Sequence, residues 1–185
     1  MRRFTGAIRS LTPKDLFMTT KTRATAESTV SSKAKDAVKA KDAIALLKAD
    51  HEAVSQLFAE YGKTHSITNK KALVAEICTA LSIHAQVEEE IFYPAVKLAL
   101  KDKHMVPEAM VEQASLKRLI GQLEGVEPDG EMYDARVKVL SEYVTHHVKE
   151  EHTEMFPKAK ASSLDMMELG ARMAARKAEL LADKA

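Results

Sequence analysis

The apolar positions of this chain recur at spacings of three, four and seven residues, which is the period of an amphipathic α-helix. The pattern predicts helices over about residues 35–62, 69–93, 107–124 and 131–154, and a further amphipathic segment over about 164–181. Glycine and polar residues separate them near positions 62–69, 101–105 and 125–130. Because short connections make successive helices antiparallel, the sequence predicts an all-α, up-down-up-down four-helix bundle with an extra C-terminal helix.

Local signals refine the expected helix ends. Thr68 or Asn69 is expected to cap the second helix, since short polar side chains accept hydrogen bonds from free amides at a helix start. Pro107 suits the first turn of the third helix. Pro94 is expected to kink or break the second helix and Pro157 to end the fourth, because proline lacks the amide hydrogen of the helical ladder.

The composition agrees with an all-α fold and narrows the function. Apolar residues make up 45% of the chain, which is enough for a core. A net charge of +1 gives no electrostatic argument for nucleic acid binding, and no apolar run reaches the roughly 18 residues that span a membrane. The single Cys78 excludes an internal disulfide and suits a cytoplasmic protein. Its helical spacing to Val74 and Leu81 predicts a small buried side chain.

The first 36 residues differ from the rest. This segment is basic, rich in serine and threonine, and without a sustained apolar period, which predicts a disordered tail. The same composition is found in organelle transit peptides, so import is the alternative if the source cell has organelles. The expected organisation is therefore a tail over residues 1–36, a bundle over 37–160 and a C-terminal helix over 161–185.

Two stretches nearly repeat each other. HAQVEEEIFYP occupies residues 84–94 and HVKEEHTEMFP occupies residues 147–157. Both contain a histidine, a glutamate four residues later, an aromatic residue at the ninth step and a proline at the tenth. On a helix, His84 and Glu88 share a face with apolar residues, and so do His147 and Glu151. Both pairs are therefore predicted to point into the core.

A buried carboxylate is unfavourable unless it is paired or binds a metal. A histidine and a glutamate one helical turn apart can reach a single cation. A solvated face or a buried His–Glu hydrogen bond would explain one such pair. Two pairs in matching apolar surroundings favour a metal site, since the second and fourth helices of the bundle run parallel and can bring both pairs to one level.

The first and third helices extend the repeat. Aligning Asp50-His51 with Glu112-Gln113 places acid over acid and apolar residues over apolar residues downstream. The predicted metal ligands are thus His51, His84, Glu88, His147 and Glu151, with Gln113 as a doubtful sixth. For His51, a hydrogen-bonded core histidine is the alternative.

Four other polar residues are not assigned as ligands, and the sequence predicts their exposure or pairing instead. His65 is expected on the surface. His146 and His152 lie off the apolar stripe and are expected to be exposed, with contact to a ligand as the alternative. Lys117 is expected to extend to solvent or to pair with a carboxylate.

Three imidazoles and two carboxylates form a mixed nitrogen and oxygen set without a thiolate. Such a set suits iron, manganese or zinc, and has too many nitrogens for calcium or magnesium. A carboxylate from each of two parallel helices can bridge two metals. One metal bound by four or five of the groups is the alternative.

The order of these residues resembles the hemerythrin-like (HHE cation-binding) family, bacterial type. The phrases LLKADHEAV, HAQVEEEIFYPA and YVTHHVKEEHTEMFP carry the resemblance, which covers about residues 43–160. It implies a four-helix bundle with a non-haem di-iron centre, in which His51, His84 and His147 are terminal ligands, and Glu88 and Glu151 bridge. Family members usually have histidine where this chain has Gln113, so a single iron stays the alternative.

The expected function is iron binding by a protein that senses, buffers or handles O2, peroxide, NO or iron, as in a stress response. An enzyme that consumes peroxide or NO is one alternative, since open coordination positions permit chemistry. The other is a bundle with a degraded site that acts as an interaction module, its protein partner unknown. Neither nucleic acid nor a membrane is expected as a partner.

Overall fold

The computed structural model describes residues 41–128 and 130–184, and the helices account for most of them. In chain order they are α1 (Ala43–Tyr61), α2 (Ile67–Val87), η1 (Glu88–Phe92), α3 (Tyr93–Leu100), α4 (Met105–Gly121), α5 (Glu131–Glu150), η2 (Glu151–Met155), α6 (Phe156–Lys160) and α7 (Met166–Ala182). The predicted tail over residues 1–36 lies outside the described residues and stays a prediction, as does the cytoplasmic location.

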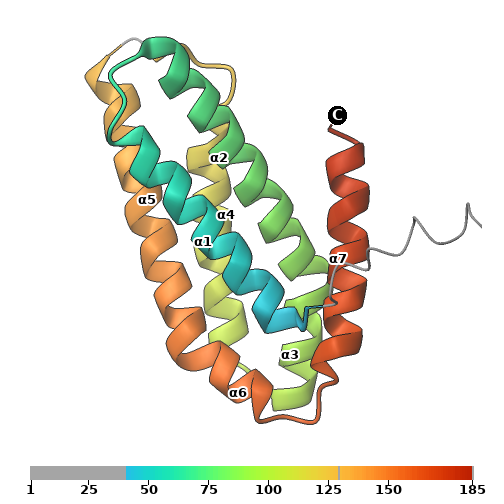
Figure 1. Cartoon of the computed structure of the whole chain (residues 1–185). Helices are drawn as coiled ribbons and strands as arrows, with labels where there is room; N and C mark the ends of the chain where they lie inside the picture. The colour runs from blue at the N-terminus through green and yellow to red at the C-terminus, as the bar shows by residue number, and fades with distance from the viewer. Residues whose placement is uncertain (1–40, 129, 185) are drawn as a thin grey trace, which may run out of the picture. The chain divides into compact units, whose positions relative to one another are not determined.

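The four long helices α1, α2, α4 and α5 form the predicted up-down-up-down bundle, and α7 lies beside it (Figure 1). Polar contacts at one end fix the directions of three of them. Tyr61, the last residue of α1, donates to Asp134 near the start of α5 over 2.5 Å. Lys70 near the start of α2 pairs with the same carboxylate at 2.8 Å. Helices α2 and α5 therefore begin at the end where α1 finishes, so they run parallel and can bring equivalent residues to one level.

Helix starts differ from the prediction where a better capping side chain is available. Ser66 caps α2 by accepting from the amide of Asn69, so the predicted caps at Thr68 and Asn69 were wrong. Asp42 caps α1, which begins at Ala43 rather than near residue 35. Asp102 accepts from the amide of Val106 over 2.8 Å, so α4 begins before Pro107.

The two prolines of the repeat lie just beyond π-helical turns. Each turn starts at a repeat glutamate, and its carbonyl accepts from the amide five residues on: Glu88 from Tyr93 and Glu151 from Phe156. A proline ring clashes with the carbonyl four residues before it, and the wider turn relieves that clash. The interruption expected at Pro94 is this π turn. The prediction that Pro157 ends the fourth helix was wrong, because the helical path continues to Lys160.

The extra residue in each π turn rotates the buried face by one position. From the last residue of η1 onward the fully buried residues are Phe92, Tyr93 and Val96, whereas Ile91 and Ala95, which a regular helix would point inward, are only partly buried. From the last residue of η2 onward the buried residues are the repeat equivalents Met155, Phe156 and Ala159.

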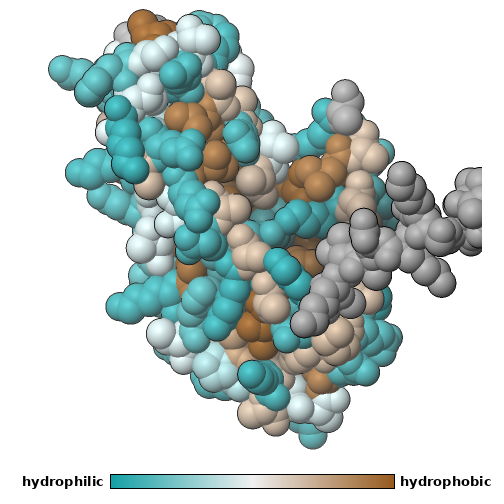
Figure 2. Space-filling view, in the orientation of Figure 1, coloured by the Kyte–Doolittle hydropathy of each residue, from teal (hydrophilic) through white to brown (hydrophobic). Residues whose placement is uncertain are grey.

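The core has two apolar clusters, one on each side of the buried polar groups. One cluster joins the π turns, α3, α6 and α7 to the start of α1, and the other fills the opposite half of the bundle. Apolar side chains are also visible where α7 meets the bundle on a face that is otherwise mostly hydrophilic (Figure 2). Cys78 is buried as predicted, and burial raises the pKa of its thiol to about 11. None of the described helices is long and apolar enough to span a membrane.

Gly170 sets how closely α7 approaches the start of α1. A Cβ atom at this position would lie 2.4 Å from the Lys41 carbonyl oxygen and 2.7 Å from the Ala43 amide nitrogen. Because these are backbone atoms, we expect Gly170→Ala to lower the free energy of unfolding by about 1–3 kcal/mol, as overpacking does. Urea unfolding followed by circular dichroism measures the change.

Gly121→Ala is the matched control, since a Cβ at Gly121 meets no atom within 4 Å. This variant should be as stable as the wild type or slightly more so. Equal stability of the two alanine variants would contradict the close approach at Gly170.

Candidate metal centre

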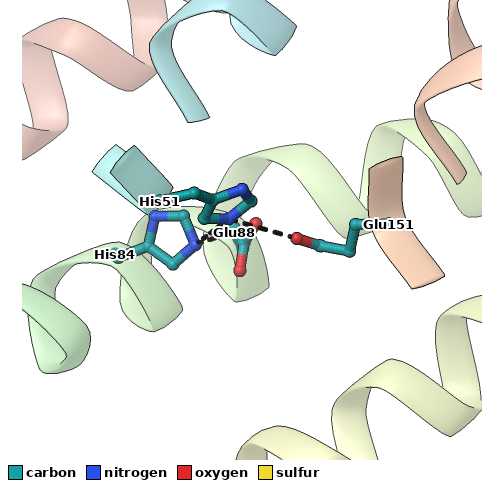
Figure 3. A group of neighbouring side chains, drawn as sticks. All are labelled: His51, His84, Glu88 and Glu151. Atoms are coloured by element: carbon teal, nitrogen blue, oxygen red, sulfur yellow. Dashed lines mark hydrogen bonds and ion pairs between the residues drawn. The ribbon is translucent and has the colours of Figure 1, made fainter. Parts of the chain in front are cut away.

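Four of the predicted ligands converge in the bundle core. His51 comes from α1, His84 from α2, Glu88 from η1 and Glu151 from η2, and all four side chains are buried (Figure 3). One nitrogen or oxygen from each lies within 4.8 Å of the others. The arrangement brings together helices that are far apart in sequence, as the repeat predicts.

The separations between these atoms suit a shared cation. His51 Nε2 lies 3.0 Å from His84 Nε2 and 3.3 Å from Glu151 Oε2, and His84 Nε2 lies 3.3 Å from Glu88 Oε1. Two ligands bound at about 2.1 Å are roughly 3.0 Å apart at an octahedral edge and 3.4 Å apart at a tetrahedral one. The four atoms therefore have the spacing of neighbouring ligands.

The buried oxygens of this group lack ordinary partners. Glu88 Oε1, Glu151 Oε2 and Gln113 Oε1 are buried without a hydrogen bond from any described residue. Two of these three are the oxygens that face His84 and His51. Since an unsatisfied buried polar atom is costly, the pattern fits a cation-binding site better than a closed hydrogen-bond network.

The other two predicted residues, His147 and Gln113, lie on the opposite side of the glutamates. His147 Nε2 is 3.8 Å from Glu151 Oε1, and the Gln113 amide nitrogen donates to Glu88 Oε2 over 2.5 Å. In this arrangement the amide nitrogen of Gln113, not its oxygen, faces the carboxylates. All six predicted residues thus surround one core region, while their role as ligands stays a prediction.

Tyr93 is a site residue that sequence reasoning missed. Its hydroxyl lies 3.0 Å from Glu151 Oε1, 3.2 Å from both Glu88 Oε2 and His147 Nε2, and 3.0 Å from the Gln113 amide nitrogen. On a regular helix, a residue nine positions after His84 faces the opposite side, but the π turn rotates it inward. The available signal was the aromatic residue at the ninth step of both motifs, followed by a proline.

The repeat partner of Tyr93 is Phe156, which has a different role. Its ring stacks on the imidazole of His51, with centroids 6.0 Å apart and planes within 7°. The two halves of the repeat therefore place a phenol on the His147 side of the glutamates and a plain aromatic ring on the His51 side.

Two carboxylates and a fourth histidine surround the inner ring, which is the set of six predicted residues His51, His84, Glu88, Gln113, His147 and Glu151. Glu112 accepts from His147 Nδ1 over 2.7 Å, and Asp50 lies 3.5 Å from His84 Nδ1. These are the two aligned acids of the first and third helices. His152 Nε2 lies 2.9 Å from His51 Nδ1, so its predicted exposure was wrong and the alternative, contact with a ligand, holds. Such outer partners orient histidine ligands and raise their basicity.

The remaining predictions for polar residues are confirmed. His65 and His146 are exposed, the latter between Glu112 and Glu150. Lys117 pairs with Glu89 at 2.5 Å.

The two buried glutamates differ in acidity. Burial and the adjacent charge of Glu151 raise the pKa of Glu88 well above its usual value, so Glu88 holds its proton to a higher pH than a free glutamate does. Burial also acts to raise the pKa of Glu151, but the contacts with His51 and His147 outweigh it and lower the pKa to about 2. Burial lowers the pKa of His51, which keeps that imidazole neutral and able to bind a cation.

A small apolar cavity of about 20 Å³ adjoins the histidines. His51, His84, Gln113 and His147 line it together with apolar residues such as Leu81 and Leu116. Its free volume is enough for one water-sized or diatomic molecule.

Buried imidazoles and carboxylates in the core of an up-down helical bundle define a metal-binding helical bundle. The family model described as "Hemerythrin HHE cation binding domain" matches residues 42–159. The chain therefore belongs to the hemerythrin family of HHE cation-binding domains, as its motifs suggest.

Two individual proteins are also similar. A crystal structure of a hemerythrin HHE cation binding domain-containing protein from Mycobacterium kansasii superposes with a TM-score of 0.64 at 24% identity, covering 76% of this chain and 87% of that one. A DNA nickase of Nostoc sp. (strain PCC 7120 / SAG 25.82 / UTEX 2576) is 29% identical over 111 residues, which are 60% of this chain and 31% of the nickase. The match thus spans about a third of that relative.

The proton on Glu88 has a measurable consequence for the metal-free protein. Folded Glu88 keeps its proton above the ordinary pKa of 4.5, whereas the unfolded chain releases it. Its contribution to stability is therefore complete below pH 4.5 and is lost as the pH rises through the folded pKa. Relative to Glu88→Gln, the wild type should lose up to about 1.4 kcal/mol of unfolding free energy per pH unit.

Urea unfolding of both proteins between pH 5 and 8, in the presence of chelator, measures this difference. Taking the difference cancels the opposite pH dependence of His51, whose lowered pKa makes stability fall as the pH falls. Glu76→Gln, at an exposed position, is the control and should follow the wild type. Parallel profiles for wild type and Glu88→Gln would show that Glu88 is ionised in the folded protein.

Proposed function

We propose that this protein is a non-haem iron-binding protein that senses, buffers or handles O2, peroxide, NO or iron through its buried His/Glu centre. The supporting observation is the convergence of four buried donor atoms, two of them carboxylate oxygens without hydrogen-bond partners. Imidazole and carboxylate donors without sulfur suit iron, and also zinc or manganese.

The donors divide into two positions that share the glutamates. The first position has His51, His84, Glu88 Oε1 and Glu151 Oε2. The second has His147, the other two glutamate oxygens and the Tyr93 hydroxyl. Two irons, if bound, would be held by His51 and His84 at the first position and by His147 at the second, with Glu88 and Glu151 shared between them, and Gln113 would support the second position by holding Glu88.

The cavity beside the histidines supports a small ligand. A bound iron would supply reversible ligand binding or redox chemistry at its open coordination position. The protein's part is to hold the donors, to exclude bulk water with apolar walls and to limit the ligand to a few atoms. This size favours O2, NO or peroxide over a larger substrate.

The activity of the DNA nickase relative is not extended to this chain. The nickase match covers 31% of that protein, and the net charge of +1 gives no general attraction to nucleic acid, so DNA nicking is not proposed.

Turnover of peroxide or NO at the same centre is the second candidate function, favoured by the cavity beside the histidines. Peroxide consumption by the iron-loaded wild type and by Glu151→Ala at equal rates would exclude it.

Loss of a first-position ligand should reduce metal binding while leaving the fold intact. Wild-type apoprotein that is reconstituted anaerobically with Fe(II) and then desalted should retain iron, and chelator should lower its Tm. A metal that binds only the folded state stabilises that state by about 2.7 kcal/mol when the free metal concentration is a hundred times Kd. His84→Ala should retain clearly less iron than the wild type, at most the share of the second position, and its Tm should respond less to chelator.

The control for His84→Ala is His65→Ala, which changes an exposed histidine outside the centre. Elemental analysis and thermal unfolding with and without chelator give both readouts. Iron below about a tenth of an equivalent in the wild type, with a chelator-insensitive Tm, would contradict the proposal.

Tyr93 should matter for the second position only. Tyr93→Phe removes one hydroxyl from among Glu88, Glu151, His147 and Gln113 and leaves every first-position donor unchanged. We expect the iron content to fall from about two equivalents to about one, since the second position then has fewer oxygen donors. Tyr143→Phe, at an exposed tyrosine of α5, should bind as the wild type does. Unchanged iron content in Tyr93→Phe would exclude a role for the hydroxyl in metal binding.

A further inference from the structure

Helix α7 lies beyond residues 42–159, the range that the family model matches, yet it packs at the level of the metal centre. Leu169 and Met173 are buried against the bundle, and Gly170 allows α7 to contact the start of α1. Arg176 donates to both oxygens of Glu90 in η1, over 2.7 and 3.2 Å. These contacts fix both the position and the rotation of α7 beside the centre.

The fixed rotation of α7 brings Lys177 to the carboxylate beside His84. Lys177 Nζ lies 2.5 Å from Asp50 Oδ1, and Asp50 Oδ2 lies 3.5 Å from His84 Nδ1. The Asp50 side chain is only 15% exposed, so solvent screens these charges little. The ammonium group of Lys177, which comes from outside the four-helix bundle, is therefore linked to the first-position donor His84 through Asp50.

The two halves of the repeat differ at this point. Glu112 makes a short contact of 2.7 Å with His147 Nδ1, whereas His84 Nδ1 is buried and has no hydrogen-bond partner among the described residues. Asp50 Oδ2 lies at the edge of hydrogen-bond distance from His84, and the other oxygen of Asp50 pairs with Lys177. Lys177 and His84 thus share one carboxylate through different oxygens, and the closer contact is that of Lys177.

We propose that Lys177 is a positioning residue that, through Asp50, weakens the support of His84 and so lowers the metal affinity of the first position. A carboxylate that accepts from a histidine ligand raises its basicity and commonly contributes about 10–100-fold to metal affinity. Without Lys177, Asp50 retains His84 as its partner and a sub-ångström movement completes their hydrogen bond. The inference rests on the proposed metal site.

The test is Lys177→Met in the full-length chain, with Zn²⁺ as a redox-inactive probe titrated into apoprotein against a competing chelator. We expect about tenfold tighter binding to the first position, together with a slightly lower Tm of the metal-free protein because the Lys177–Asp50 pair is lost. These opposite signs separate a positioning role from a purely structural one, in which affinity and stability fall together.

Three variants complete the design. Lys177→Arg keeps the cation and should restore wild-type affinity. The double variant Lys177→Met, Asp50→Asn should lack the increase in Zn²⁺ affinity, because the amide is a poorer acceptor than the carboxylate for the Nδ1 hydrogen of His84. Lys48→Met removes another positive charge near the centre, an exposed one that acts on His152, and so controls for the loss of a charge as such. This variant should bind Zn²⁺ with nearly unchanged affinity.

Each outcome has a distinct meaning. Unchanged or weaker Zn²⁺ binding by Lys177→Met, or an equal gain in Lys48→Met, overturns the role of Lys177 while the metal site stands. Wild type that binds Zn²⁺ no better than His84→Ala removes the metal site, and the inference with it.

Discussion

The structure depends on the burial of two glutamates and three histidines around one point in the bundle core. Removing Glu88 and Glu151 from water is unfavourable, and the metal-free protein compensates only in part. The raised pKa of Glu88 lets it hold a proton to a higher pH, and Glu88 accepts from Gln113, while Glu151 lies beside His51 and accepts from Tyr93. Two carboxylate oxygens remain without partners among the described residues. A cation would satisfy both oxygens, so the groups whose burial is unfavourable are those that would bind the metal.

The internal repeat explains both the symmetry of the centre and its differences. Asp50 and Glu112 occupy equivalent positions and each lies beside the Nδ1 atom of the equivalent histidine, His84 or His147. The equivalence ends at the inner ring, where His51 corresponds to Gln113 and Phe156 to Tyr93. One side of the glutamates therefore has two imidazoles, and the other has one imidazole, a phenol and an amide. Two ions bound there would have different donors, which favours different affinities and ligand preferences at the two positions.

Much of this arrangement could be predicted from the sequence because it follows the 3.6-residue period. His84 and Glu88 share a helix face whatever the tertiary structure, and the repeat pairs them with His147 and Glu151. Tyr93 could not be predicted by the same rule, because the π turn that rotates it inward breaks the period. The π turn itself has a local cause, the proline six residues after each glutamate. The pairing of Lys177 with Asp50 joins residues 127 positions apart and depends on how α7 packs, which no local pattern encodes.

Residues placed by the helical period and residues placed by long-range contacts differ in how a substitution affects the centre. The predicted ligands on regular helix faces are positioned by the bundle, so substituting one removes a potential donor outright. The outer groups are held by contacts such as Gly170 against α1 and Arg176 against Glu90, which can change without disturbing the inner ring. A helix added outside the bundle can therefore alter the electrostatics of one position and leave the other unchanged. In this chain α7 acts on the His84 side alone, because Glu112, the counterpart of Asp50, contacts His146 and His147 of α5 instead.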